Sequence, residues 1–324
     1  MEDDERQVTG DDNSYGSDPE MHDGADGQAA AKPAVFTFAE VMRDSWRCYR
    51  AGFVKLLFLV LAVTLPIAIV QVFLINMNFD FDGMYNAMIE ILNTGADSAA
   101  AAQEAGSLSS RMLLYVGITA FLTSISLITE AGAVILTGVE MGTLHVPDNS
   151  PSHRLAVEGE EVSFSLLFEL SFRSFPKLWL TMLIVNVVTV LGFMLCIIPG
   201  IFMYYVFIFA AYCVELTGLW GRKATFVSSL CTRKFPRASL LFAVLYFAVS
   251  EIVLSLTVSS LTSLVALSGM GRIPMAIVQV ILMCLRQLAL LFVCTSGAVL
   301  FSKMLDTVGP IIESSGIRGN AGNR

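Results

Sequence analysis

One apolar stretch, from Leu178 to Trp220, constrains this chain of 324 residues more than any other feature. Glu215 is the only acidic or basic side chain within it. About 20 apolar residues span the hydrocarbon core of a bilayer at 1.5 Å per residue, so the stretch is long enough for two crossings. Pro199-Gly200 lies in its middle, and this pair is a strong turn signal because proline presets φ and glycine tolerates positive φ. The stretch therefore predicts a transmembrane hairpin with a minimal loop.

The composition agrees with a membrane protein. The chain is 55% hydrophobic and 15% charged, with a mean hydropathy of +0.68, whereas soluble domains contain about 25% charged residues. Residues 1–31 contain ten acids and one base, Arg6, so their net charge is −9. The net charge of the whole chain is −8, so the remaining residues have a net charge of +1. No basic surplus suggests nucleic-acid binding. We expect residues 1–34 to form a disordered, acidic cytoplasmic tail that keeps the protein soluble or docks a cytosolic partner.

Hydropathy predicts an all-α, polytopic membrane bundle of six transmembrane helices. The expected segments lie near 53–76, 112–141, 177–197, 201–220, 239–267 and 274–303. Together they predict a six-helix domain over residues 35–305 and a cytoplasmic C-terminal tail over residues 306–324.

Lysines and arginines predict the orientation of these segments. They occur before the first segment, in the 142–177 and 221–238 connections and in the C-terminal tail, whereas the opposite side carries only Arg111 and Arg272. Cytoplasmic loops have an excess of lysine and arginine. The pattern therefore predicts a multi-pass protein of the cell (inner or plasma) membrane with both termini in the cytoplasm.

Three stretches, 36–61, 162–185 and 226–246, share an aromatic-rich amphipathic part, basic residues and a following apolar run. Each predicts a short interfacial amphipathic helix on the inner leaflet, with aromatic rings at headgroup level and cations near anionic lipid. Membrane lipids are therefore expected partners. The alternative is that any helix that starts in the cytoplasm acquires basic and aromatic flanks.

Ionisable residues inside a bilayer are costly and are candidate functional groups. Glu140 and Glu215 fall near predicted cytoplasmic helix ends, where they can reach the interface. Glu130, Glu251 and Arg286 fall deeper. Because Glu251 and Arg286 lie at similar depths in neighbouring antiparallel segments, we expect a buried ion pair between them. The alternative is a polar cavity or ion path that includes all three residues.

Motifs for catalysis and metal binding are absent from the sequence. It contains no P-loop, GxGxxG, HExxH, GxSxG or CxxC pattern, and its three histidines are not spaced as metal ligands. The six cysteines lie in apolar or cytosolic segments and are expected to stay reduced. We therefore predict no catalytic residue, no metal site and no cofactor.

The hairpin and the basic loop after it carry a family resemblance. They resemble the membrane domain of the bacterial glycerophosphoryl diester phosphodiesterase membrane-domain family and its stand-alone relatives, over about 36–305 and most specifically over about 164–242. Fused members carry a separate hydrolase barrel, for which this sequence has neither the length nor the motifs, so the resemblance does not imply that activity. The matching residues are a Pro-Gly-Ile turn, a helix-end glutamate and a serine-containing basic loop: Pro199, Gly200, Ile201, Glu215, Ser228, Ser229, Arg233 and Lys234.

Two functional hypotheses follow. The first is a non-enzymatic membrane protein that scaffolds or modulates an envelope or lipid-related process, with lipids and a membrane or cytosolic protein as partners. The second is a small transporter or permease component with a polar path near Glu251 and Arg286. A membrane-embedded lipid enzyme is a third class, but the sequence shows no convergent set of polar residues for it. A water-filled central cavity reached by Glu251, Arg286 and Glu130 favours the transporter, and a dry, salt-bridged bundle favours the scaffold.

Overall fold

The computed structural model describes residues 36–78, 89, 110, 113–114, 117–142, 162–253 and 272–314. The chain divides into two units, Met1–Pro33 and Ala34–Arg324, and every described residue belongs to the second. Helices account for 92% of the described residues and no strand occurs among them, which confirms the all-α prediction. The predicted acidic tail lies outside the described residues.

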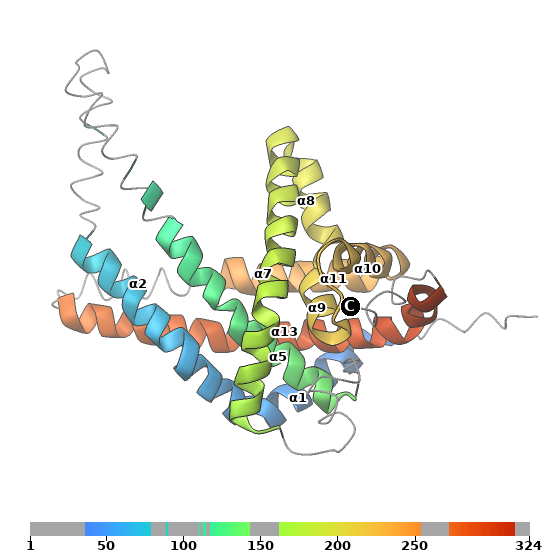
Figure 1. Ribbon diagram of the computed structural model, residues 1–324, viewed down its shortest axis with the longest axis horizontal. Helices are drawn as coiled ribbons and strands as arrows, with labels where there is room; N and C mark the ends of the chain where they lie inside the picture. Colours follow the sequence, from blue (N-terminus) through green and yellow to red (C-terminus); the bar gives the residue numbers. More distant parts are fainter. Residues whose placement is uncertain are drawn as a thin grey trace, which may run out of the picture. The chain divides into compact units, whose positions relative to one another are not determined.

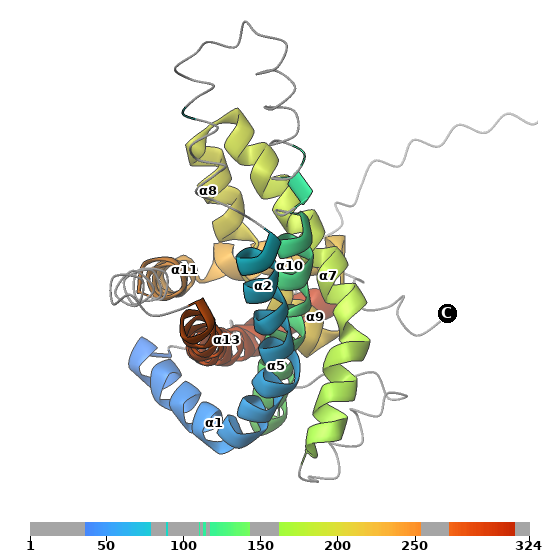
Figure 2. The same cartoon turned by 90° about the vertical axis from the view of Figure 1, so that its left-hand side faces the viewer.

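The helices of the second unit are shown in Figures 1 and 2. Their bounds are α1 Phe38–Leu59, η1 (a π-helix) Val60–Thr64, α2 Leu65–Asn78, α5 Leu127–Glu140, α7 Phe164–Leu195, α8 Ile197–Val206, α9 Ala210–Thr217, α10 Arg222–Lys234, α11 Pro236–Phe247, η2 (a π-helix) Ala248–Val253 and α13 Arg272–Ser314.

Five helical stretches are long and apolar enough to cross a membrane, so the predicted membrane helix bundle is confirmed as an architecture. They are Phe38–Phe73, Gly117–Glu140, Phe164–Leu195, Ile197–Thr217 and Ile273–Ile312. Of the predicted segment 239–267, the described part is the shorter apolar helix Pro236–Ser250 and the end of η2, and residues 254–271 lie outside the described ranges. The sixth crossing therefore stays a prediction.

The first crossing begins at a capping box. The Thr37 hydroxyl accepts a hydrogen bond from the Glu40 N–H at 3.4 Å, and the Glu40 carboxylate accepts one from the Thr37 N–H at 3.0 Å. No proline lies between Phe38 and Leu65, and the helix runs on through η1 into α2. In contrast to the expected short interfacial helix, the amphipathic stretch and the crossing form one continuous helix.

The second and third of the three amphipathic stretches each contain a Phe-Pro pair, and the two pairs behave differently. Pro176 lies inside the 32-residue helix α7, so the amphipathic and apolar parts of 162–185 again form one helix. At Phe235-Pro236 the chain breaks, with φ −122° and ψ 57° at Phe235, because proline disfavours the α conformation in the residue before it. Only the third stretch therefore contains a separate short amphipathic helix, α10.

The tight hairpin joins α7 to α8, but its turn lies at Cys196 and not at Pro199-Gly200. Cys196 is extended (φ −172°, ψ 157°), and α8 begins at the next residue. Pro199 falls in the first turn of α8, where a backbone N–H has no helical acceptor and proline costs nothing. Gly200 allows α7 and α8 to approach each other closely. A Cβ atom added at Gly192 of α7 would lie only 3.0 Å from the Gly200 Cα of α8.

α13 organises the rest of the core, since it packs against α1, α2, α5, α9 and α10. The fully buried Phe209 stacks on Phe242 at 5.6 Å and on Phe301 at 5.9 Å between ring centroids. α13 continues to Ser314 with Val308 and Ile312 buried, so the packed domain extends past the predicted boundary at residue 305.

Candidate solute-binding cavity

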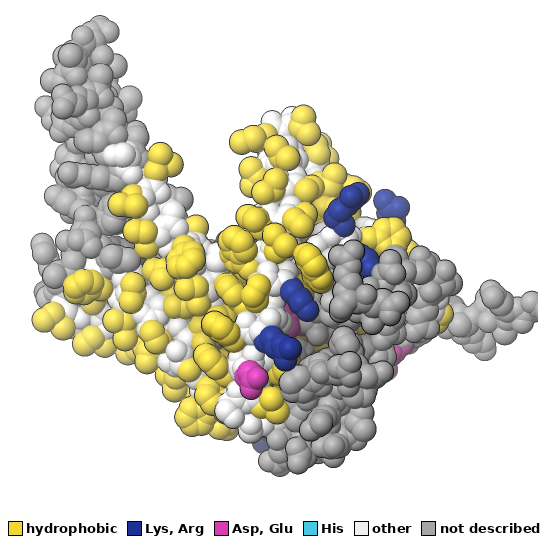
Figure 3. Space-filling view, viewed as in Figure 1, with side chains coloured by type: hydrophobic (Ala, Val, Ile, Leu, Met, Phe, Trp, Pro, Cys, Tyr) yellow, Lys and Arg dark blue, Asp and Glu magenta, His cyan; other side chains and the backbone are white. Residues whose placement is uncertain are grey.

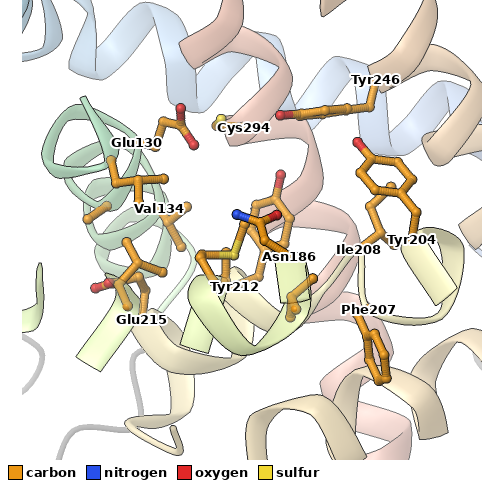
Figure 4. Close-up of a pocket in the computed structure, with 16 residues that line it drawn as sticks. Glu130, Val134, Asn186, Tyr204, Phe207, Ile208, Tyr212, Glu215, Tyr246 and Cys294 are labelled. Carbon is orange, nitrogen blue, oxygen red and sulfur yellow. The ribbon is translucent and has the colours of Figure 1, made fainter. Parts of the chain in front are cut away.

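A cavity of about 240 Å³ lies between α5, α7, α8, α9, α11 and α13 (Figure 4). Aliphatic and aromatic side chains form most of its wall. The wall residues are Leu127, Ala131, Val134, Leu178, Met182, Val185, Phe207, Ile208 and Ala211, and the residues with a polar group are Glu130, Asn186, Tyr204, Tyr212, Glu215, Tyr246 and Cys294.

The polar groups come from six different helices. Glu130 lies on α5, Asn186 on α7 and Tyr212 on α9, and Figure 4 shows their polar ends directed toward a shared space. Tyr246 of α11 directs its hydroxyl toward the same space from the other side, and Glu215 lies at a separate end. No lysine, arginine or histidine is among the described residues that line the cavity. The lining therefore combines two acidic groups with apolar walls and neutral polar groups.

Glu130 is the acidic group that most directly faces this space. The helix that carries it is almost fully buried from Ile128 to Gly138, whereas Glu130 keeps partial exposure because it borders the cavity. Its neighbour Thr129 accepts a buried hydrogen bond of 2.7 Å from the Gln287 amide of α13. This bond holds α5 against α13 and thereby sets the position of Glu130.

Glu215 lies two residues before the end of α9 and is only 8% exposed. Its Oε1 atom is buried and has no hydrogen-bond partner. Ser174 of α7 lies near its side chain and donates its hydroxyl to the Ser171 carbonyl at 3.1 Å. The charge of the exposed Lys177 also acts on Glu215. Glu215 thus lies at the helix end as predicted from sequence, but it is buried beside α7 and does not reach the surface.

A break in the fourth candidate span opens the wall of the cavity. The stretch Ile197–Thr217 is interrupted between α8 and α9 at residues 207–209, and Phe207 and Ile208 of this turn line the cavity. The buried Ser228 of α10 holds the break: its hydroxyl donates to the Val206 carbonyl at 2.8 Å and accepts from the Phe209 N–H at 3.2 Å. Interrupted membrane helices need such partners for their freed backbone groups.

Of the other predicted intramembrane charges, Arg286 and Glu140 do not line this cavity. Arg286 is exposed on α13, next to the buried Gln287, and is not a lining residue. The side chain of Glu251 lies outside the described residues, so the predicted Glu251–Arg286 pair stays a prediction. Glu140 is exposed at the end of α5.

Sequence reasoning named Glu130 but did not identify the tyrosines. Tyr204 and Tyr212 occur in one apolar run and Tyr246 in another, and no motif in the sequence connects the two runs. Asn186 carried the clearest signal, since an amide inside an apolar run of α7 needs a polar surrounding.

The fold and the cavity together define a polytopic helical membrane protein with a cavity between its helices that is lined by acidic and neutral polar groups. Comparison with protein-family models, with curated proteins and with solved structures gave no match to this chain.

Proposed function

We propose that this protein is a small, non-enzymatic transporter or permease component that carries a solute through the cavity beside Glu130. The observation that carries the proposal is the cavity itself, where two acidic groups, an amide and three tyrosines line a space between apolar helices. Asn186 and Tyr204 are exposed, and the other four polar residues are partly or fully buried. Ionisable side chains are rare in membrane helices, and where they occur they mark substrate and ion pathways. A bundle of the same hydropathy without a cavity would gain nothing from these ionisable side chains.

The interrupted helix supports the same proposal. Transporters commonly build their sites where a membrane helix is broken, because the break exposes backbone and lets the surrounding helices move. Here the break between α8 and α9 forms part of the cavity wall. The bond network of Ser228 stabilises one arrangement of this break.

The surface supports a place in the cell membrane with the basic loops in the cytoplasm. In Figure 3, hydrophobic side chains cover α2, α5 and the α7–α8 hairpin, and lysines and arginines gather over the lower half of α7 and over α10 and α11. Around α10, Trp220 and Phe226 are exposed together with five basic residues, as expected of a helix at the headgroup level. The basic residues are Arg222, Lys223, Arg233, Lys234 and Arg237.

The experiment is a swelling assay. Proteoliposomes containing the full chain are challenged with iso-osmotic choline chloride, glycerol, glycine or sodium acetate, and light scattering follows solute entry. We expect at least one solute to enter faster than into protein-free liposomes. Ala211→Phe, which fills the cavity, should abolish the difference, whereas Val187→Phe, on the exposed side of α7, should keep it. Equal rates with and without protein for the whole panel would reject transport.

A second candidate function is the scaffold or modulator of an envelope or lipid-related process. The basic, aromatic surface of α10 favours it, since this surface fits anionic lipid headgroups. Under this proposal, neutralising Arg233 and Lys234 would release a bound partner, and solute entry would be unaffected. The resemblance to the phosphodiesterase membrane-domain family is compatible with both functions.

A further inference from the structure

We propose that the cavity beside Glu130 is a binding site for a small organic cation, a protonated amine that carries an apolar body. The inference rests on the proposed transport function and names the chemical class of its solute. Three properties of the cavity lead to it: its charge, the nature of its walls and its size.

The charge balance of the cavity favours a cation. Glu130 and Glu215 both line it, and no lysine, arginine or histidine does so among the described residues. The exposed Lys177 acts on Glu215 from outside the cavity, yet the buried Oε1 of Glu215 keeps no hydrogen-bond partner. Glu130 has no ion pair within the described parts of the chain. A positively charged ligand would supply the missing counter-charge, whereas an anion would meet two acidic groups.

The walls favour an amine with an apolar body over an inorganic ion. A desolvated metal ion or alkali ion needs several oxygen ligands at short distance, and here Val134 lies between the two carboxyl groups, as Figure 4 shows. Tyrosine rings attract an organic ammonium through their faces. Phe242 packs edge-on against Tyr212, with 6.1 Å between ring centroids, and lies 6.2 Å from Tyr246, so both rings are held in place.

The size of the cavity suits a compact molecule. The volume of the cavity is about 240 Å³. A single aromatic or branched aliphatic group with one ammonium arm fits in this space. Benzylammonium is therefore a suitable probe, with benzyl alcohol and benzoate as neutral and anionic probes of nearly the same shape.

The test is equilibrium dialysis of the three probes against the full chain in nanodiscs, with empty nanodiscs subtracted. We expect benzylammonium to bind at least about tenfold more tightly than benzyl alcohol, and benzoate to bind least. Glu130→Gln should weaken benzylammonium binding by about tenfold or more and change benzyl alcohol binding by less than about twofold. Glu215→Gln should have a smaller effect in the same direction, because Lys177 already offsets part of its charge.

The matched control is Glu169→Gln, which removes an acidic group from the exposed face of α7 and should leave all three affinities unchanged. Equal binding of the charged and neutral probes, tighter binding of benzoate, or full benzylammonium affinity in Glu130→Gln would each overturn the inference. If the cavity variants do not fold, the ranking of the three probes on the wild-type protein decides alone. Cation binding without solute entry would reject only the transport function, and entry of neutral solutes without cation preference would reject only this inference.

Discussion

The break between α8 and α9 leads to a quantitative prediction for Ser228. Its side chain is fully buried and makes two hydrogen bonds to backbone groups on either side of the break, at 2.8 Å to the Val206 carbonyl and 3.2 Å from the Phe209 N–H. Ser228→Ala removes one oxygen atom and leaves both backbone groups buried without that partner. Each such loss costs about 1–3 kcal/mol, so we expect the free energy of unfolding to fall by about 2–6 kcal/mol.

The neighbouring serine is the control for this prediction. Ser229 is only partly buried and donates to the Phe226 carbonyl within its own helix, so Ser229→Ala should change stability by less than about 0.5 kcal/mol. Reversible unfolding of both variants in mixed detergent micelles, followed by circular dichroism, measures the difference. Equal stability of Ser228→Ala and Ser229→Ala would refute the claim that Ser228 holds the break.

Three further predictions follow from the packing. A Cβ at Gly297 would clash with Tyr212 and Phe242, so Gly297→Ala should destabilise by about 1–3 kcal/mol in the same unfolding assay, whereas Gly309→Ala on the same helix meets no atom and should be neutral or stabilising. Gln287→Leu, which removes the 2.7 Å bond to Thr129, should cost about 0.6–1.7 kcal/mol; a stabilised variant would contradict the proposed link between α5 and α13. Burial raises the pKa of the Cys231 thiol to about 12, so a membrane-impermeant maleimide at neutral pH should modify the exposed Cys196 and leave Cys231 unmodified, as mass spectrometry with a Cys196→Ser control can show.

The length and apolarity of the segments could be predicted from sequence, because about 20 apolar residues in a row have few other folded states than a membrane helix. The start of each crossing could not, since Pro176 stays inside α7 while Pro236 follows a break. The same Phe-Pro pair therefore continues a helix in one place and ends one in the other. The tertiary packing around each pair decides between the two outcomes. The hairpin turn lies at Cys196 and not at the predicted Pro199-Gly200 for a related reason. Proline and glycine fit a loop, but they fit equally well in the first turn of a closely packed helix.

The cavity could be predicted only in part. Glu130 stood out because a carboxylate in an apolar helix is costly wherever it points. Its partners on α7, α9 and α11 come together only through the packing of these helices, and hydropathy contains no information on which faces meet. The same limit applies to Arg286, which has the sequence signature of a buried charge and lies on the exposed side of α13.

Uptake of benzyltrimethylammonium into proteoliposomes tests the central claim most directly, since this permanent cation crosses lipid slowly and has the chemistry proposed for the cavity. Saturable uptake is predicted for the wild-type protein and for Glu169→Gln, and Glu130→Gln should reduce it to the rate of protein-free vesicles. Uptake by the wild type that equals protein-free vesicles, or uptake that Glu130→Gln leaves intact, would contradict the account.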